Sequence, residues 1–513
     1  MLWAQDAMIN VWADQQVFIA GEDIWVDGLV QQTKSVSKTM NLLLLDRNGN
    51  KKAGAEVWMQ DNGFSAYINI PENLPSDYYF IDGYMNGLKS KTALFPVMII
   101  NPKIPPAAGC SFTSKNTNAD ASSINIFTEK EVYQPRNQVK VTLGGLINLS
   151  QTHLTVVRND ELNEIYNQAV AGFNTISAYD ENTEKEEEGK SLIVHVRKNG
   201  KPVVGISVLA ALKGSAATLA VATSNSDGQL KFLFPFKYNV TEVVLRSLNN
   251  DKDLSFELSS GRTAKAIGFP CLQLEEKNKA AIEIRMLHLN VTKSFYPDFG
   301  RQLINNTIDT TDFYGKPDAR YYLDEYVRFP NMEEVIAEII QEVRVKKEKD
   351  QSLLQILNIP FKFFFNDEGL ILVDGIPFYN TNQLLESDPL QIKSIDVINR
   401  KYILGDHEFD GIVHFKTYRG DMGSLRLSES DKSFTIKGIQ ESTSVKPVVG
   451  DGSKLPDMRN TVFKKNRISS DFRGSATLQF TLSDAIGKYA IVLRGVDNQG
   501  NTVVSSKTIQ VAH

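Results

Sequence analysis

Apolar and polar residues alternate over short stretches along most of this chain, and clusters of Gly, Asn, Asp and Pro separate the stretches. The apolar positions are rich in β-branched and aromatic residues, which are typical of strands. Ile24 and Val26, for example, lie two residues apart, as the buried face of a strand requires. The stretches follow one another at the spacing of strands in β-sandwiches. The pattern therefore predicts a mainly β protein.

One segment has the period of a helix instead. In residues 331–340 (NMEEVIAEII), apolar residues recur at helical spacing, and two glutamates occupy the first turn, where the helix dipole favours acidic groups. Pro330 precedes the segment, as is common at a helix start. We expect a short helix here and few long helices elsewhere.

Length and composition exclude several classes of protein. A chain of 513 residues with 42% hydrophobic content can form several domains of roughly 100–200 residues each. The formal net charge is -5, and acidic and basic residues are interspersed, so no basic surface indicates nucleic acid as a partner. The longest apolar runs, such as 42–45 and 97–100, are far shorter than the ~20 residues of a spanning helix. We expect no nucleic-acid partner and no transmembrane helix.

The cysteines and the first residues bear on the compartment. Cys110 and Cys271 are the two cysteines, too few for a disulfide-dense scaffold or a multi-cysteine zinc site. They form one bridge or none, because two cysteines far apart in sequence need not lie close together in the fold. The start of the chain, up to Ala4, resembles the end of a secretory signal without its charged and apolar parts. This predicts an exported protein whose signal, cleaved after Ala4, is truncated or whose start codon is misplaced.

Several segments resemble the sandwich domains of alpha-macroglobulins. Residues 16–28 (QVFIAGEDIWVDG) are similar to the paired strands of MG2-type macroglobulin domains, and residues 126–141 repeat the strand, turn and strand. Residues 200–232, with a turn at Asp227-Gly228, resemble a carboxypeptidase-regulatory-like or macroglobulin-like sandwich. Residues 455–492 resemble the closing domains of macroglobulins. The resemblance implies structural sandwiches rather than catalysis.

A further resemblance is to the plug domain of TonB-dependent outer-membrane receptors. It rests on VDGIP at 373–377, IKSIDV at 392–397 and GIVHFKT at 411–417, in the order and spacing of the family. Residues 421–513 read as a soluble β domain, whereas a receptor would continue with a barrel of many strands. Residues 314–330, which precede the plug-like segment, add to this resemblance. As a whole, the chain resembles Bacteroidota envelope proteins that join macroglobulin-like sandwiches to a plug-like domain without a barrel.

The expected fold is a series of tandem immunoglobulin-like or macroglobulin-like β-sandwiches with a small α+β plug-like domain. The acidic run 180–189 is expected to be a solvated linker. Whether the plug-like domain draws strands from 280–295 stays open. The expected domains are a macroglobulin-like sandwich (1–106), a second one (107–188), a carboxypeptidase-regulatory-like or macroglobulin-like sandwich (189–262), a connecting region with a short helix (263–345), the plug-like domain (346–425) and a C-terminal macroglobulin-like sandwich (426–513).

Catalytic motifs are weak. A macroglobulin thioester needs a cysteine shortly before a Glu-Gln pair, and neither cysteine has that context. The sequence has no G-x-S-x-G elbow, its six histidines are scattered, and nothing selects one catalytic pair from its 61 acidic residues. Two aromatic clusters are expected to pack into cores rather than to bind sugars or bases: Phe361, Phe363, Phe364 and Phe365, and Tyr321 with Tyr322. We expect no enzyme activity and no cofactor.

Candidate metal loops are better explained as turns. The cluster 406–410 (DHEFD) offers carboxylate and imidazole groups, but it falls where the plug family has a variable turn, so we expect no metal there. Residues 46–50 and 497–501 lack the ligand pattern of an EF-hand and are interpreted as hairpin turns.

The sequence therefore predicts a non-enzymatic envelope protein, in the periplasm or at the outer membrane, that docks to a protein partner. Edge strands and loops of sandwiches offer surfaces for docking, and an outer-membrane barrel is one candidate partner. The expected contact residues lie in two loops: Phe378, Tyr379, Asn380 and Asp388, and Asp406, His407, Glu408 and Asp410. Two alternatives stay open: a carbohydrate-active or carbohydrate-binding protein with a multi-domain site, and a type nine secretion substrate with a C-terminal sorting domain.

Overall fold

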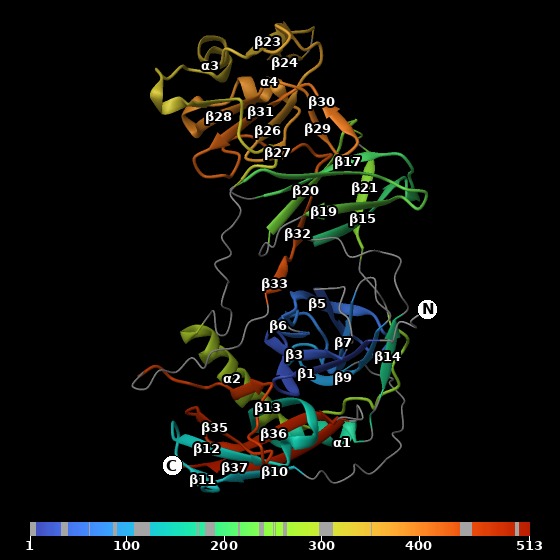
Figure 1. The fold of residues 1–513 in the computed structure, drawn as a ribbon, viewed down its shortest axis with the longest axis vertical. Coiled ribbons are helices and arrows are strands. Elements are labelled where there is room, and N and C mark those ends of the chain that lie inside the picture. Colours follow the sequence, from blue (N-terminus) through green and yellow to red (C-terminus); the bar gives the residue numbers. More distant parts are fainter. Residues whose placement is uncertain are drawn as a thin grey trace. The chain divides into compact units, whose positions relative to one another are not determined.

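The chain forms two compact units in a computed structural model (Figure 1). Unit 1 contains Met1–Glu186, Gly261–Ile304 and Ile439–His513, and unit 2 contains Glu187–Ser260 and Asn305–Gly438. The signal-like start, Cys110 and the acidic run 180–189 lie outside the described residues. The structure describes residues 7–31, 39–60, 62–85, 90–106, 124–171, 173, 175–179, 190–213, 216–234, 241–249, 251, 253–259, 264–296, 311–349, 351–441, 454–497 and 502–513.

The first sandwich of unit 1 has two sheets with an apolar core between them. One sheet has the order β14 (Ile176–Tyr179), β8 (Ser90–Ala93), β1 (Ala7–Ala13), β3 (Asp23–Gln31) and β6 (Gly63–Asn69). The other has the order β2 (Val17–Ile19), β9 (Phe95–Ile100), β7 (Asp77–Tyr84), β4 (Thr39–Leu45), β5 (Lys51–Trp58) and β33 (Ile439–Glu441). The predicted turn at 46–50 is confirmed, because it joins β4 to β5 with Gly49 at a φ of 79°.

Strand β4 is buried along its whole length because its two faces enter two different cores. Leu42 and Leu44 point into the sandwich, whereas Leu43 and Leu45 belong to a second apolar cluster. That second cluster also contains side chains of two helices, α1 (Glu161–Val170) and α2 (Lys279–Phe295), the latter preceded by the 3-10 turn η2 (Glu276–Asn278). The helices therefore cover the outer face of this sheet.

Helix α2 differs from the expectation for its segment. The question left open for residues 280–295 is whether they give strands to the plug-like domain; they form a helix within unit 1 instead. Arg285 on this helix is 1% exposed and donates to the Asp160 carboxylate over 2.8 and 3.1 Å and to the Val17 carbonyl over 2.9 Å. Asp160 is also the N-cap of α1. One buried guanidinium therefore ties α2 to α1 and β2. No helix among the described residues is long and apolar enough to cross a bilayer.

The second sandwich of unit 1 combines segments from both ends of the chain. One sheet has the order β10 (Asn125–Thr128), β12 (Gln138–Gly144) and β35 (Ala476–Thr481). The other has the order β11 (Val132–Tyr133), β37 (Thr502–Val511), β36 (Gly487–Asp497), β13 (Leu149–Asn159) and β34 (Thr461–Asn466), and the 3-10 turn η1 (Leu146–Asn148) precedes β13. The segments 107–188 and 426–513, expected as two sandwiches, share one core here, since each of the two sheets contains strands of both segments.

Unit 2 contains a third sandwich with its own apolar core. One sheet has the order β16 (Lys201–Pro202), β15 (Lys190–Lys198) and β19 (Gln229–Phe234), and β21 (Leu254–Leu258) also pairs with β15. The other has the order β18 (Thr218–Thr223), β17 (Ser207–Leu212), β20 (Thr241–Ser247) and β32 (Lys432–Ile436). The predicted turn at Asp227-Gly228 is confirmed, with Gly228 at a φ of 69° between β18 and β19.

The remainder of unit 2 is a small α+β domain on a mixed sheet. The sheet has the order β22 (Ala319–Tyr322), β28 (Ile392–Ile398), β31 (Ile412–Thr417), β26 (Leu370–Val373) and β27 (Ile376–Pro377), with β26 and β31 parallel. The other strands are β23 (Val343–Lys347), β24 (Ser352–Asn358) and β25 (Phe363–Phe364), and the hairpin β29 (Tyr402–Leu404) and β30 (His407–Phe409). The helical elements are α3 (Met332–Ile339), α4 (Thr381–Leu385), η3 (Leu323–Glu325) and η4 (Pro389–Gln391).

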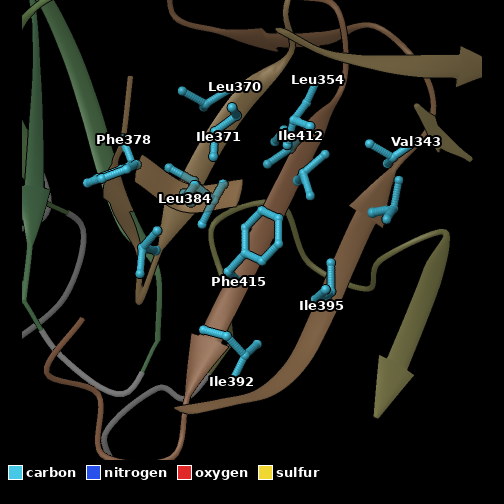
Figure 2. Packing of buried hydrophobic residues seen from close by; sticks show 14 of the residues in the cluster. Val343, Leu354, Leu370, Ile371, Phe378, Leu384, Ile392, Ile395, Ile412 and Phe415 are labelled. Atoms are coloured by element: carbon cyan, nitrogen blue, oxygen red, sulfur yellow. The ribbon is translucent and has the colours of Figure 1, made fainter. Parts of the chain in front are cut away.

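The core of this domain brings the predicted helix and the plug-like motifs together. The helix expected at 331–340 is confirmed as α3, which is capped by Asn331. Figure 2 shows side chains of the cluster, such as Phe415 of β31, lying along the sheet. In VDGIP, Asp374 and Gly375 have φ values of 47° and 80°, and the Asp374 carboxylate accepts the Thr417 backbone N–H over 2.7 Å. This tight turn therefore fastens β26 to the end of β31.

Replacing Arg285 with methionine should strongly destabilise unit 1. The variant removes the bidentate partner of the half-buried Asp160 carboxylate, which keeps Arg158 at 3.3 Å. Breaking a buried ion pair costs about 3–5 kcal/mol, and we expect the lower end of this range. The free energy of unfolding can be measured in urea by tryptophan fluorescence, because all 4 tryptophans lie in unit 1. Lys279→Met on the same helix removes an exposed cation and should change stability by less than about 0.5 kcal/mol. Equal losses of unfolding free energy in the two variants would contradict the role of Arg285 in joining α2 to α1 and β2.

Candidate functional site

The first predicted contact loop is partly buried. Phe378 is 2% exposed and lies in the apolar core (Figure 2), so the prediction is wrong for this residue. The guanidinium of Arg246 lies 4.5 Å from the centre of the Tyr379 ring. Asn380 and Asp388 each accept a backbone N–H group at the start of a helical turn. Their side chains therefore hold the loop backbone, and contact with a partner stays a prediction for these three residues.

The second predicted contact loop is the hairpin between β29 and β30. The Lys401 ammonium pairs with Glu408 and lies 3.7 Å from the Asp410 carboxylate. Burial raises the pKa of Asp410, and Lys401 opposes this. Asp406 is exposed and His407 is half-buried. The loop is thus held by an ion pair, and its contact with a partner also stays a prediction.

A buried cluster in the α+β domain contains three residues that often bind metals. Ligand atoms of Asp312, Asp396 and His414 lie within 4.8 Å of one another. The Lys416 ammonium, however, lies 2.6 Å from Asp312 and 3.0 Å from Asp396. Arg320 donates to Asp396 through two nitrogens over 2.5 and 2.7 Å. Two cations therefore balance the two carboxylates, and the ammonium occupies the place of a metal ion, so these residues do not fit one.

The protonation of this cluster follows from its hydrogen bonds. The backbone N–H of Gly375 donates to His414 Nε2 over 2.9 Å, so the proton of the neutral ring is on Nδ1. That N–H donates to the Tyr314 hydroxyl over 2.7 Å, and the hydroxyl donates to Asp396 over 2.9 Å. Burial lowers the pKa of His414 to about 4, which keeps the ring neutral. The cluster therefore connects the turn after β26 to the neighbouring strands and has a structural role.

Unit 1 contains a cavity of about 400 Å³ between the loops flanking β2, helix α2 and the segment before β34. Three acidic residues line it: Asp23 is half-buried, whereas Asp14 and Glu22 are buried, at 6% and 8% exposed. Asp14 accepts the Trp25 backbone N–H over 3.1 Å and the Thr461 hydroxyl over 3.0 Å. Glu22 accepts the Gln15 side-chain amide over 3.1 Å. We call this the Asp14–Glu22 cavity.

Both buried carboxylates of the cavity have raised pKa values. Burial raises the pKa of Asp14 to about 6, although the nearby Lys464 opposes the rise. Burial raises the pKa of Glu22 to about 7, with Arg285 opposing it. Within the described part of the chain neither carboxylate forms an ion pair. Both therefore change charge near neutral pH.

In a second polar cluster of unit 1 the buried carboxylate has its own cation. Asp27 is 0% exposed, and the Lys464 ammonium donates to it over 3.0 Å. Burial would raise the pKa of Asp27, but the attraction to Lys464 outweighs it and holds the pKa below its ordinary value. The His153 ring stacks on Trp12 at 5.7 Å and lies 2.5 Å from Asn466 Oδ1, and burial lowers its pKa to about 4. This neutral histidine contacts an asparagine rather than a serine or cysteine, so it forms no nucleophile–base pair.

The prediction that the two aromatic clusters pack into cores is wrong for three of their residues, which are exposed. Phe365 is 2% exposed, as expected, but Phe361 is 74% and Phe363 50% exposed. Tyr322 is also exposed, at 42%. Residues 359–364, which are the turn after β24 together with β25, are called the aromatic hairpin below. Its tip has Lys362 at a φ of 58°, and the Lys362 N–H donates to the Asn358 carbonyl over 2.7 Å.

The comparisons with known proteins give distant matches. No protein-family model and no curated protein matches the chain. It is similar to trypsin-activated alpha-2-macroglobulin from Escherichia coli, at 8% identity and a TM-score of 0.23 over 99% of this chain and 42% of that one. The native conformation of that protein gives 9% identity and a TM-score of 0.23 over 99% and 40%. The elastase-activated form gives 8% identity and a TM-score of 0.23, over 99% of this chain and 44% of that one. The chain spans less than half of these proteins, and at such TM-scores the likeness carries no argument about function.

Replacing Glu22 with glutamine should change the stability of unit 1 in a pH-dependent way. The pKa of Glu22 is about 7 in the folded protein and ordinarily 4.5, so its favourable contribution is complete below about pH 4.5 and is lost as the pH rises through 7. Glu22→Gln should therefore gain up to about 3 kcal/mol relative to the wild type between pH 5 and pH 8. Urea unfolding followed by tryptophan fluorescence measures this difference.

The matched control is Glu131→Gln, which makes the same charge change at an exposed position of unit 1. Its stability difference from the wild type should be the same at both pH values. If Glu22→Gln also shows no change with pH, the assignment of a raised pKa to Glu22 is wrong.

Proposed function

We propose that this chain is a non-enzymatic binding protein of the bacterial cell envelope, and that its α+β domain docks to a protein partner through the aromatic hairpin. The location rests on the resemblance of the sequence to macroglobulin and plug domains, and on Cys271. Cys271 is disulfide-bonded, and Cys110 is the other cysteine of the sequence. Disulfides persist in oxidising compartments, which supports the periplasm or the outer membrane.

The exposed phenylalanines carry the docking proposal. Phe361 and Phe363 lie in contact range of each other, with ring centres 6.4 Å apart, and Ile359 beside them is 46% exposed. The core of the α+β domain is complete without them, since Phe365 and Ile356 fill the adjacent buried positions. Large exposed apolar side chains that the core does not need mark sites of interaction.

The aromatic hairpin is preformed, which lowers the entropic cost of binding. The Lys362 backbone donates to Asn358, and β24 pairs with β25 through Leu357 and Phe364. The Arg344 guanidinium lies 4.1 Å from the centre of the Phe364 ring and so covers one face of β25. A rigid apolar tip of this kind fits an apolar groove on a protein partner.

A protein partner fits the local charges better than a membrane surface does. The lysines on the neighbouring strand β23 are neutralised, because Lys346 pairs with Glu348 over 2.8 Å and Lys347 with Glu333 over 2.6 Å. Binding to anionic lipids draws on several unpaired basic groups. The plug-like resemblance further favours an outer-membrane protein as the partner.

Photo-crosslinking in intact cells tests this proposal. Phe361→p-benzoylphenylalanine should form an adduct with an outer-membrane protein, identified by mass spectrometry. Val327→p-benzoylphenylalanine, at an 80% exposed position elsewhere in the same domain, is the matched control and should give no such adduct. Adding Phe363→Ser to the first variant should reduce the adduct at least about tenfold, as expected for a hot-spot residue.

Two outcomes would contradict the docking site. One is an equal adduct yield at positions 361 and 327. The other is flotation of the purified protein with vesicles of phosphatidylethanolamine and phosphatidylglycerol that Phe361→Ser abolishes, since this would assign the hairpin to lipid.

A further inference from the structure

The Asp14–Glu22 cavity contains acceptor atoms that the described residues leave unused. Gln15 is 6% exposed and lines the cavity, and its Oε1 atom accepts no hydrogen bond from the described part of the chain. The hydroxyl of Tyr296, at the same cavity, has no hydrogen-bond partner there either. Buried polar atoms in native proteins are nearly always satisfied. An unsatisfied amide oxygen at a cavity wall therefore indicates a position that a donor from a ligand fills.

The two buried carboxylates of the cavity, Asp14 and Glu22, form no ion pair with the cations around them. Three nearby cations form ion pairs with other carboxylates. Arg285 pairs with Asp160 at 2.8 Å, Arg459 with Asp457 at 2.7 Å, and Lys464 with Asp27 at 2.9 Å. Lys293, which also lines the cavity, is exposed on α2. The cavity is thus a buried acidic site that lacks a counter-ion within the described residues.

We infer that the Asp14–Glu22 cavity binds an organic cation with a guanidinium head group, such as an arginine side chain. A guanidinium has five N–H donors, enough for both carboxylates and for Gln15 Oε1. The volume of about 400 Å³ is within the range of small-molecule sites, roughly 300–1,000 Å³. It leaves room for the alkyl part of the ligand beside Trp25 and Leu289.

A metal ion fits this cavity less well than a guanidinium. Metal ligands must converge on one point at about 2–2.6 Å. Among the described residues, Asp14 and Glu22 belong to no group of three acidic, histidine or cysteine ligands within 4.8 Å. A planar cation whose donors point in different directions can instead bridge acceptors that are spaced apart.

Calorimetric titration with n-butylguanidinium, and with its neutral analogue n-butylurea, tests the inference on the wild-type protein. The cation should bind at about pH 8, and the urea should bind at least about tenfold more weakly, because only the cation matches the carboxylates. Lys464 and Asp27 face Asp14, and Arg285 and Lys293 face Glu22. The other charged or titratable groups that line the cavity are Asp23, His288 and Arg459. Since burial raises the pKa values of Asp14 and Glu22 to about 6 and about 7, affinity for the cation should fall at least about tenfold between pH 8 and pH 5.

Variants locate the binding. Glu22→Gln and Asp14→Asn should each weaken n-butylguanidinium binding at least about tenfold at pH 8, whereas Glu131→Gln should leave it unchanged. Equal binding of the cation and the urea, absence of cation binding, or unchanged affinity in both cavity variants would each overturn the inference. The comparison of the two probes on the wild type keeps the test decisive if a variant fails to fold. The result is independent of the aromatic hairpin, which lies in unit 2.

Discussion

The pairing of buried charges is the constraint on which unit 1 depends. Asp27 lies in β3 and receives its cation from Lys464, 437 positions further along the chain. Arg285 reaches back 125 positions to Asp160. Burying either charge without its partner would cost several kcal/mol, because the interior solvates ions poorly. The strands near both ends of the sequence and helix α2 therefore have to be present together. For this reason the C-terminal strands share a core with β10–β13.

The exceptions to this pairing are the features on which the two binding proposals rest. Most buried carboxylates described above have a cation or several N–H donors, as Asp396 has from Arg320 and Lys416. Asp14 and Glu22 are buried without an ion pair in the described residues, and they border a cavity. The aromatic hairpin is the corresponding exception among apolar residues, since Phe361 is exposed although the core beside it is closed. Each exception is unfavourable for the isolated chain and becomes favourable when a ligand or partner supplies the missing contact.

The sequence predicted those parts of the fold that local periodicity determines. Alternation gave the strands, and the helical pattern gave α3. Helix α2 was missed because its buried face contains Arg285 and His288, whereas Ile284 and Leu287 are 41% and 60% exposed. The same helix packs Ala281, Ile282, Met286 and Leu289 against the core. Apolar residues therefore occur on more than one side of α2, and the segment shows no single apolar stripe.

The candidate sites were beyond prediction for a related reason. Asp14 and Thr461, which bond across the cavity, are 447 positions apart, and no local pattern connects them. A signal for polar chemistry was present in the run of Asp14, Gln15 and Gln16 between two apolar strands, but it did not indicate a cavity. The exposure of Phe361 and Phe363 was equally hidden, because an apolar cluster in a sequence looks the same whether it packs inward or outward.

The most direct test of this account is a pH titration of the side-chain carboxyl groups by carbon-13 NMR, with Asp14, Glu22 and Asp27 assigned by substitution to Asn or Gln. The account predicts that Asp14 titrates near pH 6 and Glu22 near pH 7, whereas Asp27, held by Lys464, titrates below its ordinary value of 3.8. If Asp14 and Glu22 instead titrate at or below their ordinary values of 3.8 and 4.5, they are already paired in the protein, and the cavity has no place for a cation.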